Sequence, residues 1–459
     1  MGRTKRKRCR KKPRSFDSCD HSEELVLFNK WLHANGVRRN AKLSLAVFED
    51  TGRGVLTKKK IRPGEEFINL PLNLTINVST ILLDSTFCYI FLENTKQCLS
   101  EYKQTISFHS MMAFYLTFLK VREQNTEWYI YLQNLPKEYT VPYFLTDELK
   151  SLIDPDLLTV ISKQKNVIDS SFGVFLDILN SNVSDNQVVK TFKNCFTKCD
   201  YEWAYFTVNT RCVYMDLSKV IDLKNVENTI LNLISDNTKI SLCPYLDMIN
   251  HSPSARNETQ LIVSKHIENL NIKDLNTDLI SNINFSIYTK NYFEPYSEVF
   301  ICYGDSHNLK LITEYGFFIP NNDLDYVSFT FKDVQTFLNK TTKLSQDQIN
   351  FIKSHGLNKD LYIDNRGLSY NFYGLLMVVK YYYNRETDVC KLIYSAAICS
   401  NDMSLNGIIK PMVEEKLRKT RELLEKIKLF ENRLEFLLMC SKVFDPSLTI
   451  SISMSLTYP

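Results

Sequence analysis

The feature that most constrains the fold is the order in which strand-type and helix-type segments follow one another. Residues 42–77 alternate short runs of β-favouring residues with turn signals. Helical periodicity dominates from Ser107 to Ser235, strand texture returns from Leu242 to Ile301, and the chain is helical again after Asp325. This order predicts an α+β fold in which a strand-rich domain with a helical insertion is followed by a helical domain.

Two helices have clear features in the sequence. Residues 20–35 carry apolar residues at helical spacing, with Asp20 or Ser22 as the N-terminal cap and Gly36 as the natural end. Residues 107–123 are apolar on more than one face. The second pattern predicts a helix buried on all sides.

A third helix is predicted over Pro411–Phe436, close to the end of the chain. Its charged residues form i,i+4 pairs of opposite sign, Glu414 with Arg418 and Glu422 with Lys426. Its apolar residues share one side of the helix: Leu417, Leu424, Ile427 and Leu434. The segment is therefore predicted to be a strongly amphipathic helix.

Charge is distributed unevenly along the chain. The net charge of the 459 residues is +4, but residues 1–14 carry nine Lys or Arg and no acid, so the other residues carry −5. A slightly acidic body is not typical of a nucleic-acid-binding protein. Residues 1–20 are predicted to be a basic disordered tail, which can also serve as a nuclear import signal or as an electrostatic contact with nucleic acid.

Composition and cysteine spacing exclude further classes. Hydrophobic residues at 44% and charged residues at 24% are ordinary for a soluble globular protein, which excludes disorder through most of the chain. The twelve cysteines have no zinc-finger spacing, and no apolar signal segment follows the basic start. The longest apolar run, near Met111–Leu119, is shorter than the ~20 residues of a membrane span. We expect an intracellular protein with reduced thiols and no membrane segment.

Four segments could carry chemistry, although each has an ordinary structural explanation. Thr51–Gly54 reads as a tight turn, and Leu246–Ser252 places Asp, Asn and His at the end of an apolar run. Trp203–Arg211 ends in an Arg that could hold a carboxylate in a bidentate pair. Glu298–Gly304 ends in Tyr-Gly, and a second Tyr-Gly follows in Glu314–Phe317. Taken singly, they fit a hairpin, an Asx turn, a helix end and core aromatic residues.

In this order, the four segments resemble the SET-domain methyltransferases. The resemblance is to the branch with a helical insertion and a C-terminal substrate-binding domain of the Rubisco-methyltransferase type, and it runs from Leu25 to the last helices. It implies a SET domain of small β-sheets over residues 21–320, with a helical insertion at about 90–235. An all-α substrate-binding domain over residues 325–445 would follow.

The chain departs from the family pattern in two places. Ser297-Glu298 stands where many members have Gly-Glu, which removes some turn flexibility but no catalytic side chain. Residues 254–290 are longer and more polar than expected, and we predict a surface loop insertion there. The zinc cysteines that follow some SET domains are absent from the sequence, as is usual in this branch.

The resemblance implies transfer of a methyl group from S-adenosyl-L-methionine to a protein lysine, without a metal. Tyr303 would act at the transfer point and Tyr315 would line the lysine channel. Carried over residue by residue, the cofactor site would consist of Gly52, Arg53, Gly54, Arg211, Asp247, Asn250, His251 and Tyr303. In it, Arg211 would pair with the cofactor carboxylate, and Asp247 would support the Asn250-His251 turn.

Two other activities stay open from the sequence. One is methylation of a protein histidine, which a relative in this branch performs, and the other is a catalytically silent protein-binding module that keeps the fold. The expected substrate is a histone tail or a non-histone lysine, since an acidic body suits a basic partner. We expect a monomer in nucleus and cytoplasm, with no nucleic-acid contact except through the basic tail.

Overall fold

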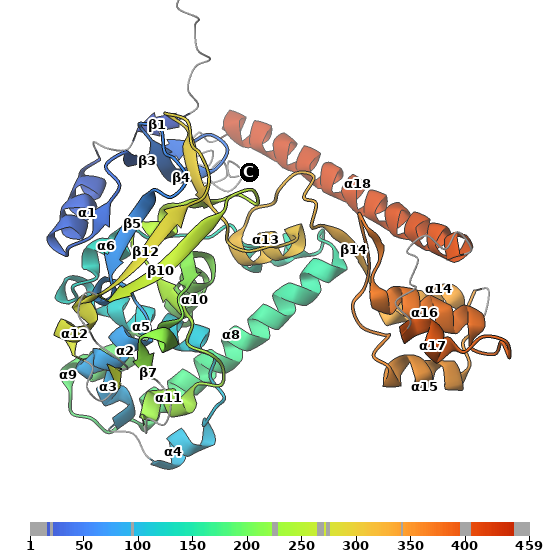
Figure 1. Cartoon of the computed structure of the whole chain (residues 1–459), viewed down its shortest axis with the longest axis horizontal. Coiled ribbons are helices and arrows are strands. Elements are labelled where there is room, and N and C mark those ends of the chain that lie inside the picture. The colour runs from blue at the N-terminus through green and yellow to red at the C-terminus, as the bar shows by residue number, and fades with distance from the viewer. Residues whose placement is uncertain are drawn as a thin grey trace, which may run out of the picture. The chain divides into compact units, whose positions relative to one another are not determined.

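The computed structural model describes residues 16–18, 22–92, 96–222, 228–263, 270–271, 276–340, 343–394 and 405–444 (Figure 1). The chain divides into two compact units. Unit 1 comprises Met1–Tyr139 and Gln164–Asp305, and unit 2 comprises Thr140–Lys163 and Ser306–Pro459. The basic residues 1–14 lie outside the described residues, and the predicted domain limits stay predictions.

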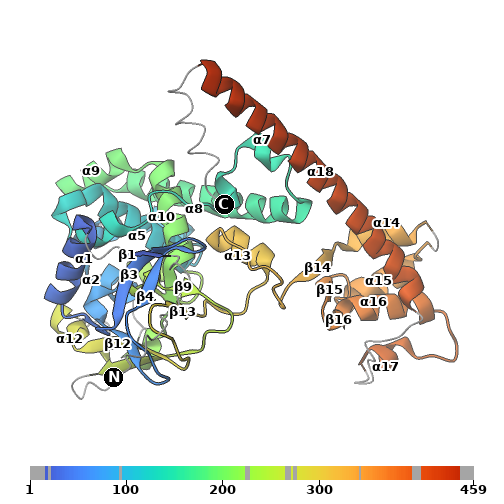
Figure 2. The ribbon, with the colours of Figure 1, turned by 90° about the horizontal axis from the view of Figure 1, so that it is seen from above.

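A five-stranded sheet in unit 1 carries most of the predicted site. Its strands lie in the order β1, β3, β4, β13, β9, and Figure 2 shows β13 and β9 beside the β3–β4 hairpin. Strand β13 pairs antiparallel with β4 and parallel with β9, so it joins two segments that are far apart in sequence. The bounds are β1 Phe16–Ser18, β3 Leu43–Phe48, β4 Gly52–Thr57, β13 Glu298–Ile301 and β9 Asn250–His251.

A four-stranded sheet in unit 1 corrects the prediction for residues 254–290. Its strands lie in the order β10, β12, β5, β2, and Figure 1 shows β10, β12 and β5 side by side. The bounds are β10 Asn257–Val263, β12 Ile283–Thr289, β5 Glu66–Pro71 and β2 Arg38–Arg39. The prediction of a surface loop was wrong for these strands, because β10 is an edge strand in which three of the four exposed residues are polar.

Two short strand pairs and several helices complete unit 1. Strand β6 (Cys212–Tyr214) pairs with β8 (Ile240–Leu242), and β7 (Ile221–Asp222) pairs with β11 (Leu270–Asn271). The α-helices are α1 Glu23–Ala34, α2 Val78–Leu83, α3 Ser85–Leu92, α4 Lys96–Glu101, α5 Phe108–Arg122, α6 Tyr129–Asn134, α9 Gln187–Cys195, α10 Lys198–Arg211, α11 Thr229–Leu233 and α12 Thr277–Ser281. The 3₁₀ turns are η1 Leu72–Leu74, η2 Glu123–Asn125, η4 Leu217–Lys219 and η5 Leu246–Met248.

The two helices with clear sequence signals form as predicted. Helix α1 begins after Ser22, and Gly36 follows its end with a left-handed φ of +79°. Helix α5 is buried on all sides from Met111 to Leu119. Within this interior the ring of Phe114 stacks on Phe175 of α8 (Pro155–Ser181), with 4.1 Å between centroids. The apolar run that is too short for a membrane span is therefore the centre of the unit 1 core.

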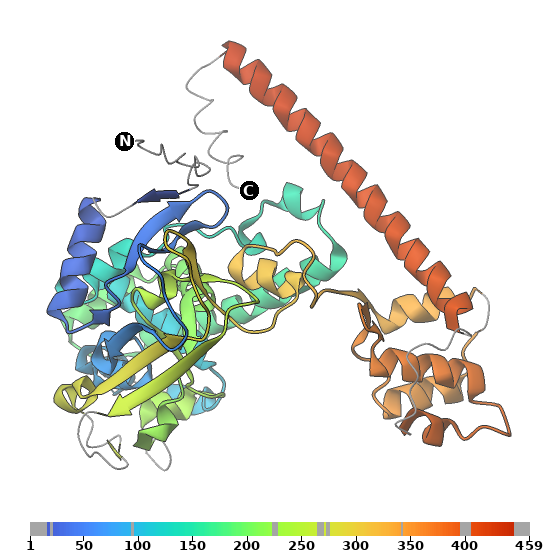
Figure 3. The same ribbon diagram turned by 45° about the horizontal axis from the view of Figure 1, so that its top comes forward.

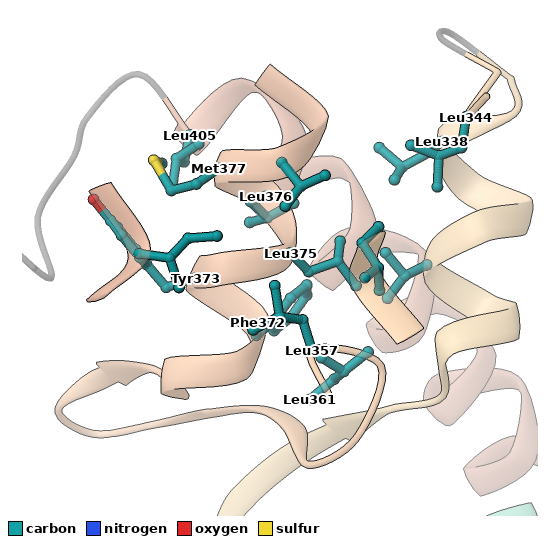
Figure 4. Packing of buried hydrophobic residues seen from close by; sticks show 14 of the residues in the cluster. Leu338, Leu344, Leu357, Leu361, Phe372, Tyr373, Leu375, Leu376, Met377 and Leu405 are labelled. Carbon is teal, nitrogen blue, oxygen red and sulfur yellow. The ribbon is translucent and has the colours of Figure 1, made fainter. Parts of the chain in front are cut away.

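In its described residues, unit 2 is helical except for one small sheet, which the prediction of an all-α domain did not include. The sheet contains β14 (Tyr326–Phe329), β15 (Leu361–Asp364) and β16 (Gly367–Leu368). Around α16, apolar side chains such as Phe372, Leu375 and Leu376 form a separate core (Figure 4). The helical elements besides α8 are η3 Pro142–Phe144, α7 Asp147–Lys150, α13 Asn308–Tyr315, α14 Phe331–Leu338, α15 Gln346–Ser354, α16 Tyr370–Tyr381, α17 Val389–Tyr394 and α18 Asn406–Phe444.

The C-terminal helix is longer than predicted and differs in detail. Helix α18 runs as one rod in Figure 3 and includes Pro411. Arg418 pairs with Glu415 and Glu422, whereas the predicted Glu414 is not its partner. On the predicted apolar side, Leu417 is 45% exposed and Leu424 is 49% exposed. None of the helices in the described part of the chain is both long enough and apolar enough to span a membrane.

Candidate active site

The Gly-x-Gly segment forms the tip and start of the β3–β4 hairpin. Gly52 pairs with Phe48 and has a φ of +68°, a left-handed conformation that favours glycine. Arg53 points away from the hairpin, and its Nη2 donates to the main-chain oxygen of Asn134, 2.6 Å away, at the end of α6. Gly54 is needed for a different reason, since a Cβ atom there would lie 2.5 Å from Glu298 Oε1 and 2.7 Å from Asn250 Nδ2.

Asn250 and Glu298 bind this hairpin from two neighbouring strands. Asn250 Nδ2 donates to Glu298 Oε1 at 2.8 Å and lies 3.3 Å from the main-chain oxygen of Arg53. The hydroxyl of Thr51 donates to the Glu298 carboxylate, with oxygen–oxygen distances of 2.8 and 2.9 Å. The Asn250 amide, predicted to hold the cofactor, is therefore also what ties β9 to the hairpin.

His251 and Tyr303 lie together at the end of the parallel β9–β13 pair. The main-chain N–H of Tyr303 donates to His251 Nδ1 at 3.0 Å, and the two ring centroids are 5.1 Å apart. Because Nδ1 accepts, the proton of the neutral ring belongs on Nε2. Partial burial lowers the pKa of His251, which favours this neutral form.

The hydroxyl of Tyr303 has a fixed orientation. It donates to the main-chain oxygen of Ile249 at 2.8 Å, in the segment that leads into β9. The hydroxyl hydrogen is therefore committed, and the oxygen can act only as an acceptor toward an incoming N–H group. The side chain is partly buried, so such an interaction would be only partly screened by water.

A buried charge pair lies at the other end of the same segment. Asp247, in η5, has a side chain with 0% exposure, and its Oδ2 lies 3.3 Å from Arg211 Nη1. Arg211 also donates to the main-chain oxygen of Asp247 at 3.0 Å, and the buried Tyr131 hydroxyl donates to Asp247 Oδ2 at 2.9 Å. Burial raises the pKa of Asp247, while Arg211 and Tyr131 favour its charged form and oppose the rise.

Arg211 interacts electrostatically with Asp247 and with three tyrosines. Burial has the largest single effect and lowers the pKa of Arg211, but Asp247 together with Tyr139, Tyr131 and Tyr303 outweighs it and raises the pKa above its usual value. The guanidinium therefore stays charged inside the unit. Within the described part of the chain its Nε atom and Asp247 Oδ1 are buried without a hydrogen-bond partner, which leaves one donor and one acceptor for an amino-acid ligand.

The structure thus brings eight predicted site residues together in unit 1, on β4, α10, η5, β9 and the segment after β13. They are Gly52, Arg53, Gly54, Arg211, Asp247, Asn250, His251 and Tyr303. Arg211, predicted to pair with a cofactor carboxylate, has Asp247 as its partner here. Tyr315, at the end of α13, belongs to unit 2, so its place in a lysine channel stays a prediction.

Sequence reasoning did not assign roles to Thr51, Tyr131, Tyr139 and Glu298. Glu298 stood in the motif before Tyr303, but its partners are 48 and 247 residues away. Tyr131 and Tyr139 lie in an aromatic stretch that gave no signal beyond helix and core. Among the described residues there is no group of three or more His, Cys, Asp or Glu side chains that could hold a metal ion.

The residues present fit S-adenosylmethionine in two respects. Arg211 Nε is a buried, unpaired donor suited to a carboxylate. Gly52 has open space where a Cβ atom would be, so its main chain can be approached closely by a ligand.

Comparison with known proteins gives relatives over most of the chain. No family model matches it. Human SET domain-containing protein 4 is 27% identical over 368 residues, which are 79% of this chain and 74% of that protein. The ribosomal lysine N-methyltransferase set11 of Schizosaccharomyces pombe is 23% identical over 74% of this chain and 71% of its own length. The actin-histidine N-methyltransferase of Drosophila melanogaster is 24% identical over 69% of this chain and 53% of its own length.

The fold is shared with solved structures. The SET domain of LSMT bound to lysine and AdoHcy superposes with a TM-score of 0.52 at 19% identity, over 81% of this chain and 73% of that one. The mixed architecture of small sheets and helices predicted from the sequence is therefore confirmed. Over most of its length this chain is therefore similar to SET domain-containing proteins and named methyltransferases, and it shares the fold of a SET-domain methyltransferase.

Proposed function

We propose that this chain transfers the methyl group of S-adenosylmethionine to a lysine side chain of a protein substrate. The observation that carries the proposal is the fixed Tyr303 hydroxyl, 2.8 Å from the Ile249 carbonyl, beside the neutral His251 ring. A transferase that aligns two reactants needs such a group at a defined position. The relatives named as methyltransferases support the same reaction class.

Four groups of this chain would hold the cofactor. Arg211 Nε would donate to its carboxylate, and Asn250 and His251 would contact it along β9. The main chain at Gly52 would lie along it, because no side chain intervenes. When bound, S-adenosylmethionine supplies an electrophilic methyl group on a positively charged sulfur.

The residues of this chain would then act on the lysine amine. A free lysine has a pKa of about 10.4, so the amine must lose a proton before it can attack. A partly buried site lowers that pKa, and the positive charge of Arg211 adds to the effect. The Tyr303 oxygen would accept an N–H of the neutral amine and so orient its lone pair toward the methyl group.

A histidine substrate is the second candidate. Relatives named actin-histidine N-methyltransferases cover about two thirds of this chain. Because the same fold serves both acceptors, homology alone does not choose between lysine and histidine, and the shape of the substrate channel would decide. We favour lysine because the ribosomal lysine N-methyltransferase matches a larger share of its own length, 71% against 53%. A silent binding module would not need both His251 and Tyr303 in this arrangement.

The distribution of charge along the chain supports a proposal for the substrate and for the cellular location. The chain outside residues 1–14 carries a net −5, which suits a basic partner such as a histone tail, with non-histone lysines as the alternative. We propose residence in both nucleus and cytoplasm, with residues 1–14 as the import signal. Deletion of these residues should shift a fluorescent fusion to the cytoplasm, and an unchanged distribution would contradict the import role.

The test of function is transfer of labelled methyl from S-adenosylmethionine to core histones and to a whole-cell extract. Tyr303→Phe should lower turnover about 100-fold or more, since it removes an oriented polar group at the reacting atoms. Tyr292→Phe, at an exposed tyrosine outside the site, is the matched control. Mass spectrometry would identify the acceptor. Label found only on histidine, or label unchanged in Tyr303→Phe, would contradict the proposal.

A further inference from the structure

Glu298 is a carboxylate in an unusual position for a purely structural residue. It begins β13, which lies between β4 and β9 in the five-stranded sheet. Its two carboxylate oxygens accept hydrogen bonds from Asn250 on β9 and from Thr51 in the hairpin turn. We refer to Thr51, Asn250 and Glu298 as the clasp.

The clasp is tightly packed around one glycine. A Cβ atom on Gly54 would lie 2.5 Å from Glu298 Oε1 and 2.7 Å from Asn250 Nδ2, closer than real Cβ contacts. The Asn250 amide also lies 3.3 Å from the Arg53 carbonyl and 3.4 Å from the Thr51 carbonyl. The carboxylate therefore fixes the Asn250 amide, and the amide in turn fixes the main chain of the turn.

The charge of Glu298 is not offset by a cation. Within the described part of the chain, Glu298 forms no ion pair, and its hydrogen-bond donors are a neutral amide and a neutral hydroxyl. Partial burial and the nearby Asp50 both act against its charge. A sheet needs no such group for stability, because a neutral or apolar side chain would avoid this cost. An uncompensated charge at a ligand site is instead typical of residues that place other groups.

We propose that Glu298 is a positioning residue, whose carboxylate holds the Asn250 amide and the Gly52–Gly54 main chain in the geometry that receives S-adenosylmethionine. This inference rests on the proposed function. Glu298 would not touch the reacting atoms, so its loss should weaken cofactor binding rather than the transfer itself. Ser297, which stands where many SET-domain proteins have glycine, leaves this role intact. Its hydroxyl donates to the Glu294 carbonyl and takes no part in the clasp.

The test compares Glu298→Ala, Glu298→Gln and the control Glu294→Gln, at an exposed glutamate in the loop before β13. Calorimetry would give the dissociation constant for S-adenosylmethionine, and steady-state assays would separate KM from kcat. Glu298→Ala should weaken binding and raise KM about tenfold with kcat within about threefold, because it removes hydrogen bonds to a charged group. Glu298→Gln keeps an acceptor for Asn250 and should stay within about threefold of wild type.

A second readout does not depend on catalysis. Hydrogen exchange of a peptide covering Thr51–Gly54 should be faster in Glu298→Ala than in wild type and unchanged in Glu294→Gln. A Thr51→Val variant combined with Glu298→Ala should show less than additive loss of cofactor affinity, since both remove the same contact.

The outcomes separate the two proposals. If wild type binds S-adenosylmethionine and Glu298→Ala binds it equally well, the positioning role is wrong while the proposed function stands. A fall in kcat with unchanged affinity would also overturn the positioning role. If wild type binds no S-adenosylmethionine, the proposed function fails and the inference falls with it.

Discussion

Two polar clusters hold the same segment, Leu246–His251, by different physical means. At its start, Asp247 is fully buried and pairs with the charged Arg211. At its end, Asn250 is partly buried and binds Glu298, which has no cationic partner among the residues that the structure describes. A fully buried ion must be paired, because its desolvation is otherwise too costly. A partly solvated carboxylate can remain unpaired, which leaves its hydrogen bonds available for placing the turn.

The first cluster should therefore be the more sensitive to loss of one partner. Asp247→Ala leaves the buried Arg211 charge without its counter-ion, and we expect a loss of about 3–5 kcal/mol in the free energy of unfolding. Asp185→Ala, at a fully exposed carboxylate paired with Lys190, is the control and should change the free energy of unfolding far less, because solvent screens an exposed pair. Denaturant unfolding would measure both. Equal losses in the two variants would show that the Arg211–Asp247 pair is not effectively buried.

The second cluster should be most sensitive to added side-chain volume next to Glu298 and Asn250. In Gly54→Ala the new methyl group would force Glu298 and Asn250 apart, because the available distances are 2.5 and 2.7 Å. We expect about tenfold weaker binding of S-adenosylmethionine and a stability loss on the order of 1–2 kcal/mol.

Gly173→Ala is the matched control for this substitution. Its Cβ would meet nothing within 4 Å, and it lies in α8, where alanine is the better helix former. It should raise stability by up to about 1 kcal/mol and leave cofactor affinity unchanged. Wild-type affinity in Gly54→Ala would mean that the clasp can open without affecting the cofactor site.

The comparison also shows what local sequence patterns can predict. Helices α1 and α5 followed from apolar spacing and end signals, because those signals act within a few residues. The edge strand β10 was missed, since a strand with one neighbour is polar and looks like a loop. Periodicity placed Leu417 and Leu424 on one side of α18, but periodicity alone does not say whether a partner covers that side, and both side chains are about half exposed.

In the candidate site, too, local motifs were visible in the sequence and long-range contacts were not. Asn250, His251 and Tyr303 were found because they stand in short motifs with a specific order along the chain. The contacts that hold them were not found, since Tyr131 and Asp247 are 116 residues apart and Thr51 and Glu298 are 247 apart. Such pairs depend on strand order and side-chain direction, which no local pattern contains.

The smallest expected effect is a pH dependence of cofactor affinity and of stability that is caused by Glu298. Burial raises its pKa, and Asp50 adds to the rise, while the hydrogen bonds from Asn250 and Thr51 oppose it. As the pH falls, the carboxylate takes up a proton and accepts these bonds less strongly, so cofactor affinity should fall at a pH above the ordinary glutamate pKa of about 4.3. Stability should change in the opposite sense. The folded protein holds this proton more tightly than the unfolded chain, so the contribution of Glu298 is greatest below the ordinary pKa and is lost as the pH rises through the raised one.

Glu298→Gln separates this effect from other titrations, because the amide keeps an acceptor but cannot lose a proton. Calorimetry between about pH 5 and pH 8 would give cofactor affinities for both proteins. Subtracting the two curves cancels the titration of His251, which both proteins share. In wild type, cofactor affinity should fall and stability should rise as the pH is lowered. If Glu298→Gln lacks both changes, the pH dependence belongs to the clasp. The same decline in both proteins would assign it to another group such as His251 and contradict a titrating Glu298.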